Sequence, residues 1–292
     1  MIRKFSYTDI LGWSHSRYNT FTTCKRQYYY SYYRKYDPET ALRANVLHRL
    51  TSVPLEIGTI THELIESILR RMKKSVDEID RGRFTEFAIR KSREVVEGKQ
   101  FQEVYYGEKA EIDFDREIFS FVSKAMVNFL ESDFLDWIKA EALAEAETWV
   151  IEPDGYGECR IDDMKAYCKV DFMFPIDGKY FVYDWKTGKR SPKHKEQLWG
   201  YAAWVHFHFG ASFEEIRPAV VYLLPEYKVE EISLSEFEID ELSDRIRRET
   251  EEMYSYLSEV EKNKPKPKSE FPMTENLKLC GYCNFRELCG RE

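Results

Sequence analysis

The chain contains 292 residues, of which 43% are hydrophobic and 33% are charged, with only 13 Gly and 10 Pro. This composition excludes collagen-like, low-complexity and wholly disordered classes, and the length predicts about two domains or one large domain with insertions. No run of about 18 apolar residues is present, and the first residues lack the apolar block of a signal peptide. We therefore expect a soluble, cytoplasmic protein without a membrane partner.

The net charge of −8 hides a strong segregation of charge along the chain. Residues 1–36 carry seven Lys or Arg against Asp9, and residues 179–195 carry six against Asp184. Residues 226–261, in contrast, carry thirteen acidic residues against four basic ones. The binding of a polyanion depends on the local charge of the protein more than on its net charge, because salt screens charges beyond about 10 Å. Two basic segments on an acidic body are compatible with nucleic-acid binding, although ordinary solvated surfaces give the same pattern.

The hydrophobic pattern predicts helices first, then a sheet, then a second helical region. Helical spacing covers 56–74 and continues through 75–140, after which the period changes to two. Two hairpins are expected next: strands 147–151 and 158–162 paired across 153–155, and strands 167–174 and 179–187 joined at Asp177-Gly178. They are followed by a helix at 194–209 and a strand at 219–224. The last elements are an acidic helix at 236–261 that buries Ile239 and Leu257, and an extended, solvated linker at 262–268. This order predicts an α/β or α+β core.

Five regions follow from these elements. They are an aromatic and basic segment at 1–55, a helical region at 56–140, a sheet core at 141–225, an acidic helix and linker at 226–268, and a Cys-rich tail at 269–292.

The expected hairpin around Asp177-Gly178 carries the sharpest chemical prediction. A two-residue turn pairs positions whose numbers sum to 355, which sets Asp171 opposite Asp184. The alternation places Asp171, Met173, Val182, Asp184 and Lys186 on one face, and Cys168, Val170, Phe172, Phe174, Phe181, Tyr183 and Trp185 on the face expected to meet the core. Opposed like charges destabilise a sheet, and Mg²⁺ or Mn²⁺ would compensate for them. An exposed face with alternating charges is the alternative interpretation.

Three polar side chains on helices could extend this site. His62 shares a helix side with Gly58, Ile65 and Leu69, so it points toward protein, either as a core histidine or as a third metal ligand. Gln197 and Tyr201 are one helical turn apart and either form an amphipathic flank or contact a phosphate or base beside Lys186. Lys186 itself is placed to orient a water or to stabilise phosphate charge.

Four of the six cysteines are spaced like metal ligands. Cys280, Cys283 and Cys289 form a C-x₂-C-x₅-C motif at the end of the chain, and Cys24 lies in the aromatic segment near its beginning. Thiolates at such spacing bind zinc or an iron–sulfur cluster. A three-plus-one arrangement fits a cluster that joins the two ends of the chain. Cys159 and Cys168 are expected to be packed thiols.

The aromatic segment allows two interpretations that are compatible with each other. Several rings of the run Tyr28, Tyr29, Tyr30, Tyr32, Tyr33 and Tyr36 are expected to pack a helix onto the body. One or two exposed rings, Tyr28 among the candidates, would stack on bases of a single strand. The basic residues that would accompany them on nucleic acid are Arg17, Lys25, Arg26 and Arg34.

Taken together, these residues resemble the PD-(D/E)XK nuclease superfamily, and specifically its RecB-like branch. The matching pieces are GTITHELIE with His62, YCKVDF with Asp171, YDWKTGK with Asp184 and Lys186, and QLWGYA with Gln197 and Tyr201. Cys24 and the terminal Cys triplet resemble the subgroup with a four-iron four-sulfur cluster, which includes the nuclease associated with CRISPR adaptation. The resemblance implies a restriction-endonuclease-like α-β-β-β-α-β core with a helical insertion.

The resemblance also implies roles for individual residues. His62, Asp171, Asp184 and the main-chain carbonyl of Trp185 would bind Mg²⁺ or Mn²⁺, Lys186 would be the catalytic lysine, and Gln197 with Tyr201 would support it. Cys24, Cys280, Cys283 and Cys289 would hold the cluster, with zinc as the less favoured alternative.

The functional expectation is a metal-dependent deoxyribonuclease. We expect an exonuclease that prefers single-stranded DNA or strand ends, working in DNA repair, recombination or CRISPR adaptation with helicase or adaptation partners. The alternatives are a non-catalytic DNA-binding assembly subunit of the same fold and a zinc-stabilised interaction protein.

Overall fold

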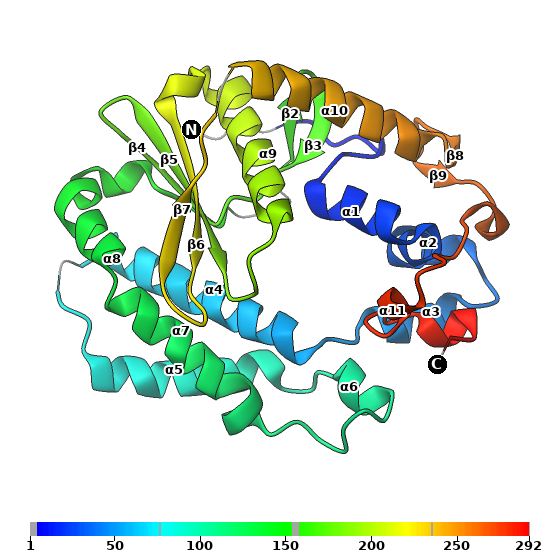
Figure 1. The fold of residues 1–292 in the computed structure, drawn as a ribbon, viewed down its shortest axis with the longest axis horizontal. Helices are drawn as coiled ribbons and strands as arrows, with labels where there is room; N and C mark the ends of the chain where they lie inside the picture. Colours follow the sequence, from blue (N-terminus) through cyan, green and yellow to red (C-terminus); the bar gives the residue numbers. More distant parts are fainter. Residues whose placement is uncertain (1–4, 76, 154–157, 235, 292) are drawn as a thin grey trace.

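A computed structural model describes residues 5–75, 77–153, 158–234 and 236–291. Its principal sheet is flanked by helices on both faces (Figure 1). The helices are α1 (His15–Thr23), α2 (Lys25–Tyr33), α3 (Ala41–His48), α4 (Val53–Met72), α5 (Arg81–Val96), α6 (Gln102–Tyr105), α7 (Ser120–Leu130), α8 (Asp133–Trp137), α9 (Pro192–Phe209), α10 (Glu236–Tyr254) and α11 (Leu277–Cys280). The strands are β1 (Val150–Ile151), β2 (Glu158–Ile161), β3 (Met164–Tyr167), β4 (Phe172–Ile176), β5 (Lys179–Lys186), β6 (Ile216–Tyr222), β7 (Lys228–Glu231), β8 (Leu257–Glu259) and β9 (Lys264–Pro265).

The principal sheet has the strand order β1-β4-β5-β6-β7. Strands β5 and β6 are parallel and are joined through α9, whereas the other neighbours are antiparallel. Along the chain, α4, β1, β4, β5, α9 and β6 follow the expected α-β-β-β-α-β order, with the β2–β3 hairpin inserted after β1. This mixed α/β arrangement is compatible with the PD-(D/E)XK fold.

The predicted register of the β4–β5 hairpin is confirmed. Phe172 pairs with Tyr183 and Phe174 with Phe181, so paired positions sum to 355. Asp177 and Gly178 both have positive φ, 48° and 73°, as a type I′ turn requires. This turn therefore fixes which side chains of β5 share a face.

Both faces of the sheet are buried, which the sequence interpretation did not anticipate. Phe172, Phe174, Tyr183 and Trp185 pack toward α4, α7 and α8. Met173 and Val182 pack toward α9 on the opposite side. The prediction that Cys168 and Val170 share the Phe172 face is wrong, because β4 begins only at Phe172 and both residues precede it and join the α9 side. Cys159 and Cys168 are buried thiols, as expected.

The predicted pairing of 147–151 with 158–162 is also wrong. β1 pairs with β4, and β2 pairs instead with β3 in a separate two-stranded sheet. Asp162 and Asp163 have positive φ and form the β2–β3 turn that the sequence interpretation overlooked. Of the turn expected at 153–155, residues 154 and 155 lie outside the described part of the chain.

The region after β7 differs from the expected long helix and linker. α10 ends at Tyr254, so Leu257 is buried from strand β8 rather than from a helix. The expected linker at 262–268 instead contributes β9, which pairs with β8, and Lys268 forms an ion pair with Asp37. Leu242, Ile246 and Met253 are buried along α10, as expected, whereas the side chain of Ile239 lies outside the description.

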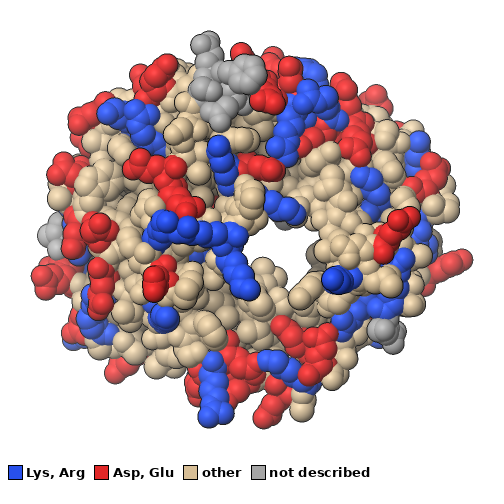
Figure 2. Space-filling view, in the orientation of Figure 1, with Lys and Arg blue, Asp and Glu red and all other residues tan. Residues whose placement is uncertain are grey.

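The two ends of the chain pack together beside the sheet. α1, α2 and α3 lie next to α11, and α10 runs from the sheet toward β8 and β9 above them (Figure 1). Figure 2 shows an opening through the molecule between the sheet side and these terminal segments, with Lys and Arg side chains at its rim. Within the described ranges, no helix has the length and apolar character needed to cross a bilayer.

Candidate functional site

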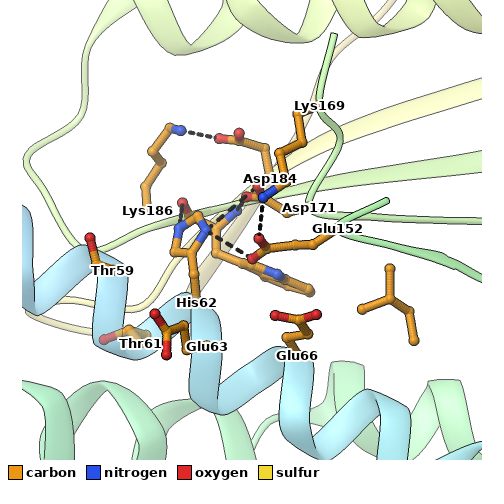
Figure 3. A network of polar contacts seen from close by, with 12 residues as sticks. Thr59, Thr61, His62, Glu63, Glu66, Glu152, Lys169, Asp171, Asp184 and Lys186 are labelled. Carbon is orange, nitrogen blue, oxygen red and sulfur yellow. Dashed lines mark hydrogen bonds and ion pairs between the residues drawn. The ribbon is translucent and has the colours of Figure 1, made fainter. Parts of the chain in front are cut away.

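The site lies at the end of β5 that adjoins α4 and β1. Asp184 is buried near the carboxyl end of β5, and Lys186, two residues later, lies on the same face of the strand. Their side chains form an ion pair in which Nζ lies 2.5 Å from Oδ2 (Figure 3). Asp171 precedes β4 and accepts a hydrogen bond of 2.8 Å at Oδ2 from the backbone N–H of Trp185. The hairpin thus brings Asp171, Asp184 and Lys186 to one place.

His62 reaches this site from the middle of α4. Its Nδ1 lies 3.5 Å from Oδ1 of Asp171, and its Nε2 lies 3.0 Å from the backbone carbonyl oxygen of Trp185. The helix is held against the sheet by an apolar stripe that includes Ile60, Leu64 and Ile68. Burial lowers the pKa of His62, but the charge of Asp171 and its hydrogen bonds outweigh burial and raise that pKa well above its usual value.

Glu152 is a member of the site that the sequence analysis missed. It follows β1, and its Oε1 lies 3.6 Å from Nδ1 of His62. Its backbone N–H donates to the carbonyl oxygen of Asp171, and Lys169 forms an ion pair with its other carboxylate oxygen. The sequence did contain a signal, because Glu152 is an acidic residue directly after a short apolar strand. The wrong partner predicted for that strand placed Glu152 away from the site.

The side chains present fit a divalent cation. One ligand atom from each of His62, Glu152 and Asp171 lies within 4.8 Å of the others. Among the described residues, Oδ1 of Asp184 and Oε1 of Glu152 are buried without a hydrogen-bond partner, while Oδ2 of Asp184 faces Nζ of Lys186. Buried polar atoms are normally satisfied, so these carboxylates are suited to a hard cation such as Mg²⁺ or Mn²⁺.

The protonation of the carboxylates agrees with that interpretation. Burial and the neighbouring charge of Asp171 raise the pKa of Asp184 to about 7, against the opposing effect of Lys186. Glu152 has its pKa lowered to about 2, because hydrogen bonds from His62 and Lys169 outweigh its burial. Glu152 is therefore ionised, whereas the ionised form of Asp184 is energetically unfavourable in this buried position unless a cation is near.

Gln197 and Tyr201 lie on α9 above the Asp184 face. Nε2 of Gln197 donates a hydrogen bond of 2.7 Å to the hydroxyl oxygen of Tyr201. Tyr201 is buried, and its pKa is raised well above the usual value by burial and by the charges of Asp184 and Asp171. This places the pair within electrostatic range of the carboxylates, with Tyr201 a neutral phenol.

The four cysteines singled out in the sequence line one cavity. Cys24 at the start of α2 meets Cys280, Cys283 and Cys289 there, together with Tyr30 and Phe285. Backbone N–H groups of Gln27 and Thr274 lie 3.5 and 3.4 Å from Sγ of Cys24, and Nη1 of Arg291 lies 3.4 Å from Sγ of Cys280. Burial raises the pKa of Cys283 to about 12, with the three neighbouring thiols contributing.

The aromatic and basic segment is mostly used for packing. Tyr28 is fully buried, and Arg17 is buried beneath it, with Nε 3.2 Å from the Tyr28 hydroxyl. This burial leaves neither side chain available for the direct nucleic-acid contact expected of it. Within the run from Tyr28 to Tyr36, the exposed rings are Tyr32 and Tyr36, with exposed fractions of 40% and 39%.

The other three basic residues expected on nucleic acid are partly buried and have partners within the protein. Lys25 pairs with Glu252, Arg26 donates to the carbonyl oxygen of Phe271, and Arg34 donates to Asn45.

Comparison with known proteins places this site in a family. A sequence profile described as the PD-(D/E)XK nuclease superfamily matches residues 12–290. A solved structure described as "Crystal structure of SSO0001" is 17% identical in sequence, and the match covers 79% of this chain and 96% of that chain with a TM-score of 0.30. The comparison with curated proteins finds no match. Because the profile spans nearly the whole chain, including every residue of the site, the chain belongs to the PD-(D/E)XK nuclease superfamily.

Proposed function

We propose that the protein is a Mg²⁺- or Mn²⁺-dependent deoxyribonuclease that degrades single-stranded DNA from a strand end. The observation that carries this proposal is the convergence of His62, Glu152 and Asp171 beside the Asp184–Lys186 ion pair. Membership of the nuclease superfamily supports hydrolysis of a phosphodiester bond. A role in DNA repair, recombination or CRISPR adaptation is consistent with this activity.

The proposed chemistry assigns a task to each side chain. His62, Glu152, Asp171 and Asp184 would hold a divalent cation, with the Trp185 carbonyl oxygen nearby, and the bound cation would supply Lewis acidity toward a phosphate oxygen. Lys186, with Nζ beside Asp184, orients a water for in-line attack and stabilises the negative charge that develops on the phosphate.

Gln197 and Tyr201 act as a hydrogen-bonded pair that borders the phosphate. The 2.7 Å hydrogen bond between them fixes the amide of Gln197 above the Asp184 face. Tyr201 keeps its proton because burial and the carboxylate charges oppose its ionisation. The pair therefore serves as a neutral support, which excludes water and positions the substrate without competing for the cation.

The opening through the molecule gives a physical reason for a preference for strand ends. It lies between the sheet side and the terminal segments, and basic side chains gather at its rim (Figure 2). A single strand that reaches the site through a closed ring must be threaded from an end, and base stacking on exposed rings such as Tyr32 and Tyr36 would aid its capture. This supports exonuclease rather than endonuclease action.

The four cysteines are proposed to hold a four-iron four-sulfur cluster. The four cysteine side chains line one cavity, and the backbone N–H groups of Gln27 and Thr274 lie 3.5 and 3.4 Å from Sγ of Cys24. Thiolates gathered in this way, with N–H groups near a ligand sulfur, support the cluster proposal.

The nuclease proposal is tested with end-labelled single-stranded DNA and Mn²⁺ or Mg²⁺. Wild-type protein should release short products, Asp184→Asn should abolish them, and chelation with EDTA should do the same. The exposed Glu147→Gln is the matched control and should cleave as wild type does. DNA binding without cleavage, or equal cleavage by Asp184→Asn, would instead favour the non-catalytic subunit.

A further inference from the structure

An open cavity of about 360 Å³, lined by residues with polar groups, lies between α1 and α9, outside the metal site. One wall is formed by α1, with His15, Tyr18 and Asn19, and the other by Lys193 and Glu196 of α9. Arg245 of α10 closes the remaining side. All of these side chains belong to the described residues, and the volume is sufficient for a nucleobase.

The side chains of the cavity are already oriented by contacts with one another. Nζ of Lys193 lies 2.5 Å from Oδ1 of Asn19, so the amide NH₂ group is the part of Asn19 left to donate. Nη2 of Arg245 lies 2.9 Å from Oε2 of Glu196, and Nε of Arg245 donates to Glu249. Glu196 is thereby held through Oε2, and its carboxylate lines the cavity as an acceptor. A fixed acceptor beside amide and ammonium donors is the type of arrangement that recognises base edges.

The cavity adjoins the catalytic face along a single helix. Lys193 lies one helical turn before Gln197, and Glu196 directly precedes it. The electrostatics also indicate that the cavity lies near Lys186. Burial lowers the pKa of His15 in the cavity wall, and Lys186 is among the positive charges that lower it further. A chain whose phosphate is bound at Lys186 would therefore bring a neighbouring nucleotide to this cavity.

We propose that the cavity between α1 and α9 binds an unstacked nucleobase next to the cleaved phosphodiester, and that Glu196 and Asn19 give it a base preference. Adenine, cytosine and guanine offer an exocyclic amino group with two N–H donors to the Glu196 carboxylate, whereas thymine offers only its single ring N3–H. The cavity therefore disfavours thymine. This inference rests on the proposed function, because it assigns a specificity element to the same DNA site.

The test measures binding rather than cleavage, so that it is independent of catalysis. In the Asp184→Asn background, fluorescence anisotropy compares an oligothymidylate with the same oligonucleotide carrying one central guanine, adenine or cytosine. At least one amino-bearing base should bind roughly fivefold or more tightly than thymine. Glu196→Gln should remove the difference, because Arg245 would hold the amide oxygen and leave an NH₂ group facing the base.

Asn19→Ala provides a second variant, and the exposed Glu214→Gln provides the matched control, which should keep the preference. Equal affinity for all four oligonucleotides, or a preference that survives in both Glu196→Gln and Asn19→Ala, would overturn the nucleobase site while leaving the nuclease proposal intact. A protein that binds none of the oligonucleotides would overturn both.

Discussion

Glu152 completes the candidate site, although sequence periodicity gave no indication of its role. Its backbone is held at a φ of 34°, and its N–H group donates to the carbonyl oxygen of Asp171. Residues other than Gly adopt such a φ at an energetic cost, so the surrounding contacts hold it in place. The result is a carboxylate that faces His62 across 3.6 Å.

Replacing Glu152 by Gln should weaken cation binding. The substitution keeps the size of the side chain but removes the charge of a ligand. Loss of a residue that only orients a ligand lowers metal affinity by roughly 10- to 100-fold, so we expect a loss of at least that size here. Titration calorimetry with Mn²⁺ measures the effect, and Glu147→Gln, which lies outside the site, should bind as wild type does. Unchanged affinity in Glu152→Gln would show that Glu152 only positions His62.

Lys186 should be separable from cation binding. Lys186→Ala removes the group proposed to stabilise phosphate charge, and we expect cleavage to fall by roughly 100-fold or more. The same variant should bind Mn²⁺ at least as well as wild type, because an ammonium group that repels the cation is lost. A parallel loss of Mn²⁺ affinity and cleavage would contradict the catalytic assignment.

At the scale of elements, the success of the sequence interpretation depended on how local each pairing was. The β4–β5 hairpin was predicted in register because a two-residue turn with positive φ at Asp177 and Gly178 connects adjacent strands. β1 was assigned the wrong partner because its true partner, β4, is separated from it by the inserted β2–β3 hairpin. Short strands carry too little pattern to specify such a partner.

The residues of the candidate site were likewise predictable where they depended on local pairing. Asp171, Asp184 and Lys186 could be brought together from one local hairpin, and His62 from its position on a strongly amphipathic helix. Glu152 depended on the non-local pairing of β1 and was missed. The exposure of the tyrosines on α2 could not be predicted, because their packing partners come from segments more than two hundred residues away.

The packing of α2 gives a prediction about stability. Tyr28 is fully buried, 5.1 Å in ring-centroid distance from Phe21, whereas Tyr32 one turn later is 40% exposed. Tyr28→Ala should lower the free energy of unfolding by about 3 kcal/mol or more, because it leaves a cavity and removes one of the hydrogen-bond partners of Arg17. Tyr32→Ala should cost about 1 kcal/mol, chiefly its contact with Arg17. Urea unfolding followed by tryptophan fluorescence compares the two, and equal losses would contradict the packing role.

For the whole molecule, the proposed cluster would join two ends of the chain that are otherwise far apart in sequence. Anaerobically purified protein should contain roughly four iron atoms per chain. Cys24→Ser and Cys289→Ser should lose the iron and lower the unfolding midpoint by roughly 10 °C or more, because a link across so long a loop is released. Cys159→Ala, at a buried thiol away from the cavity, is the control and should keep its iron. Stoichiometric zinc in place of iron would refute the cluster.

The opening gives a second prediction at this scale. If a single strand must be threaded, linear single-stranded DNA should be degraded much faster than a circle of the same sequence (Figure 2). A nick introduced into the circle should restore degradation. Equal rates on circular and linear DNA, measured by gel electrophoresis, would show that the strand reaches the site from the side.

The packing of the two termini also bears on how the protein is made. Tyr29 and Tyr30 of α2 contact Phe271 and Phe285, so α2 meets these partners only after more than two hundred further residues have been synthesised. Until then the nascent chain carries a cluster of unburied tyrosine rings, the kind of surface that chaperones bind. Termination before Phe271 would therefore leave a complete catalytic sheet attached to an α2 helix whose Tyr29 and Tyr30 lack these partners.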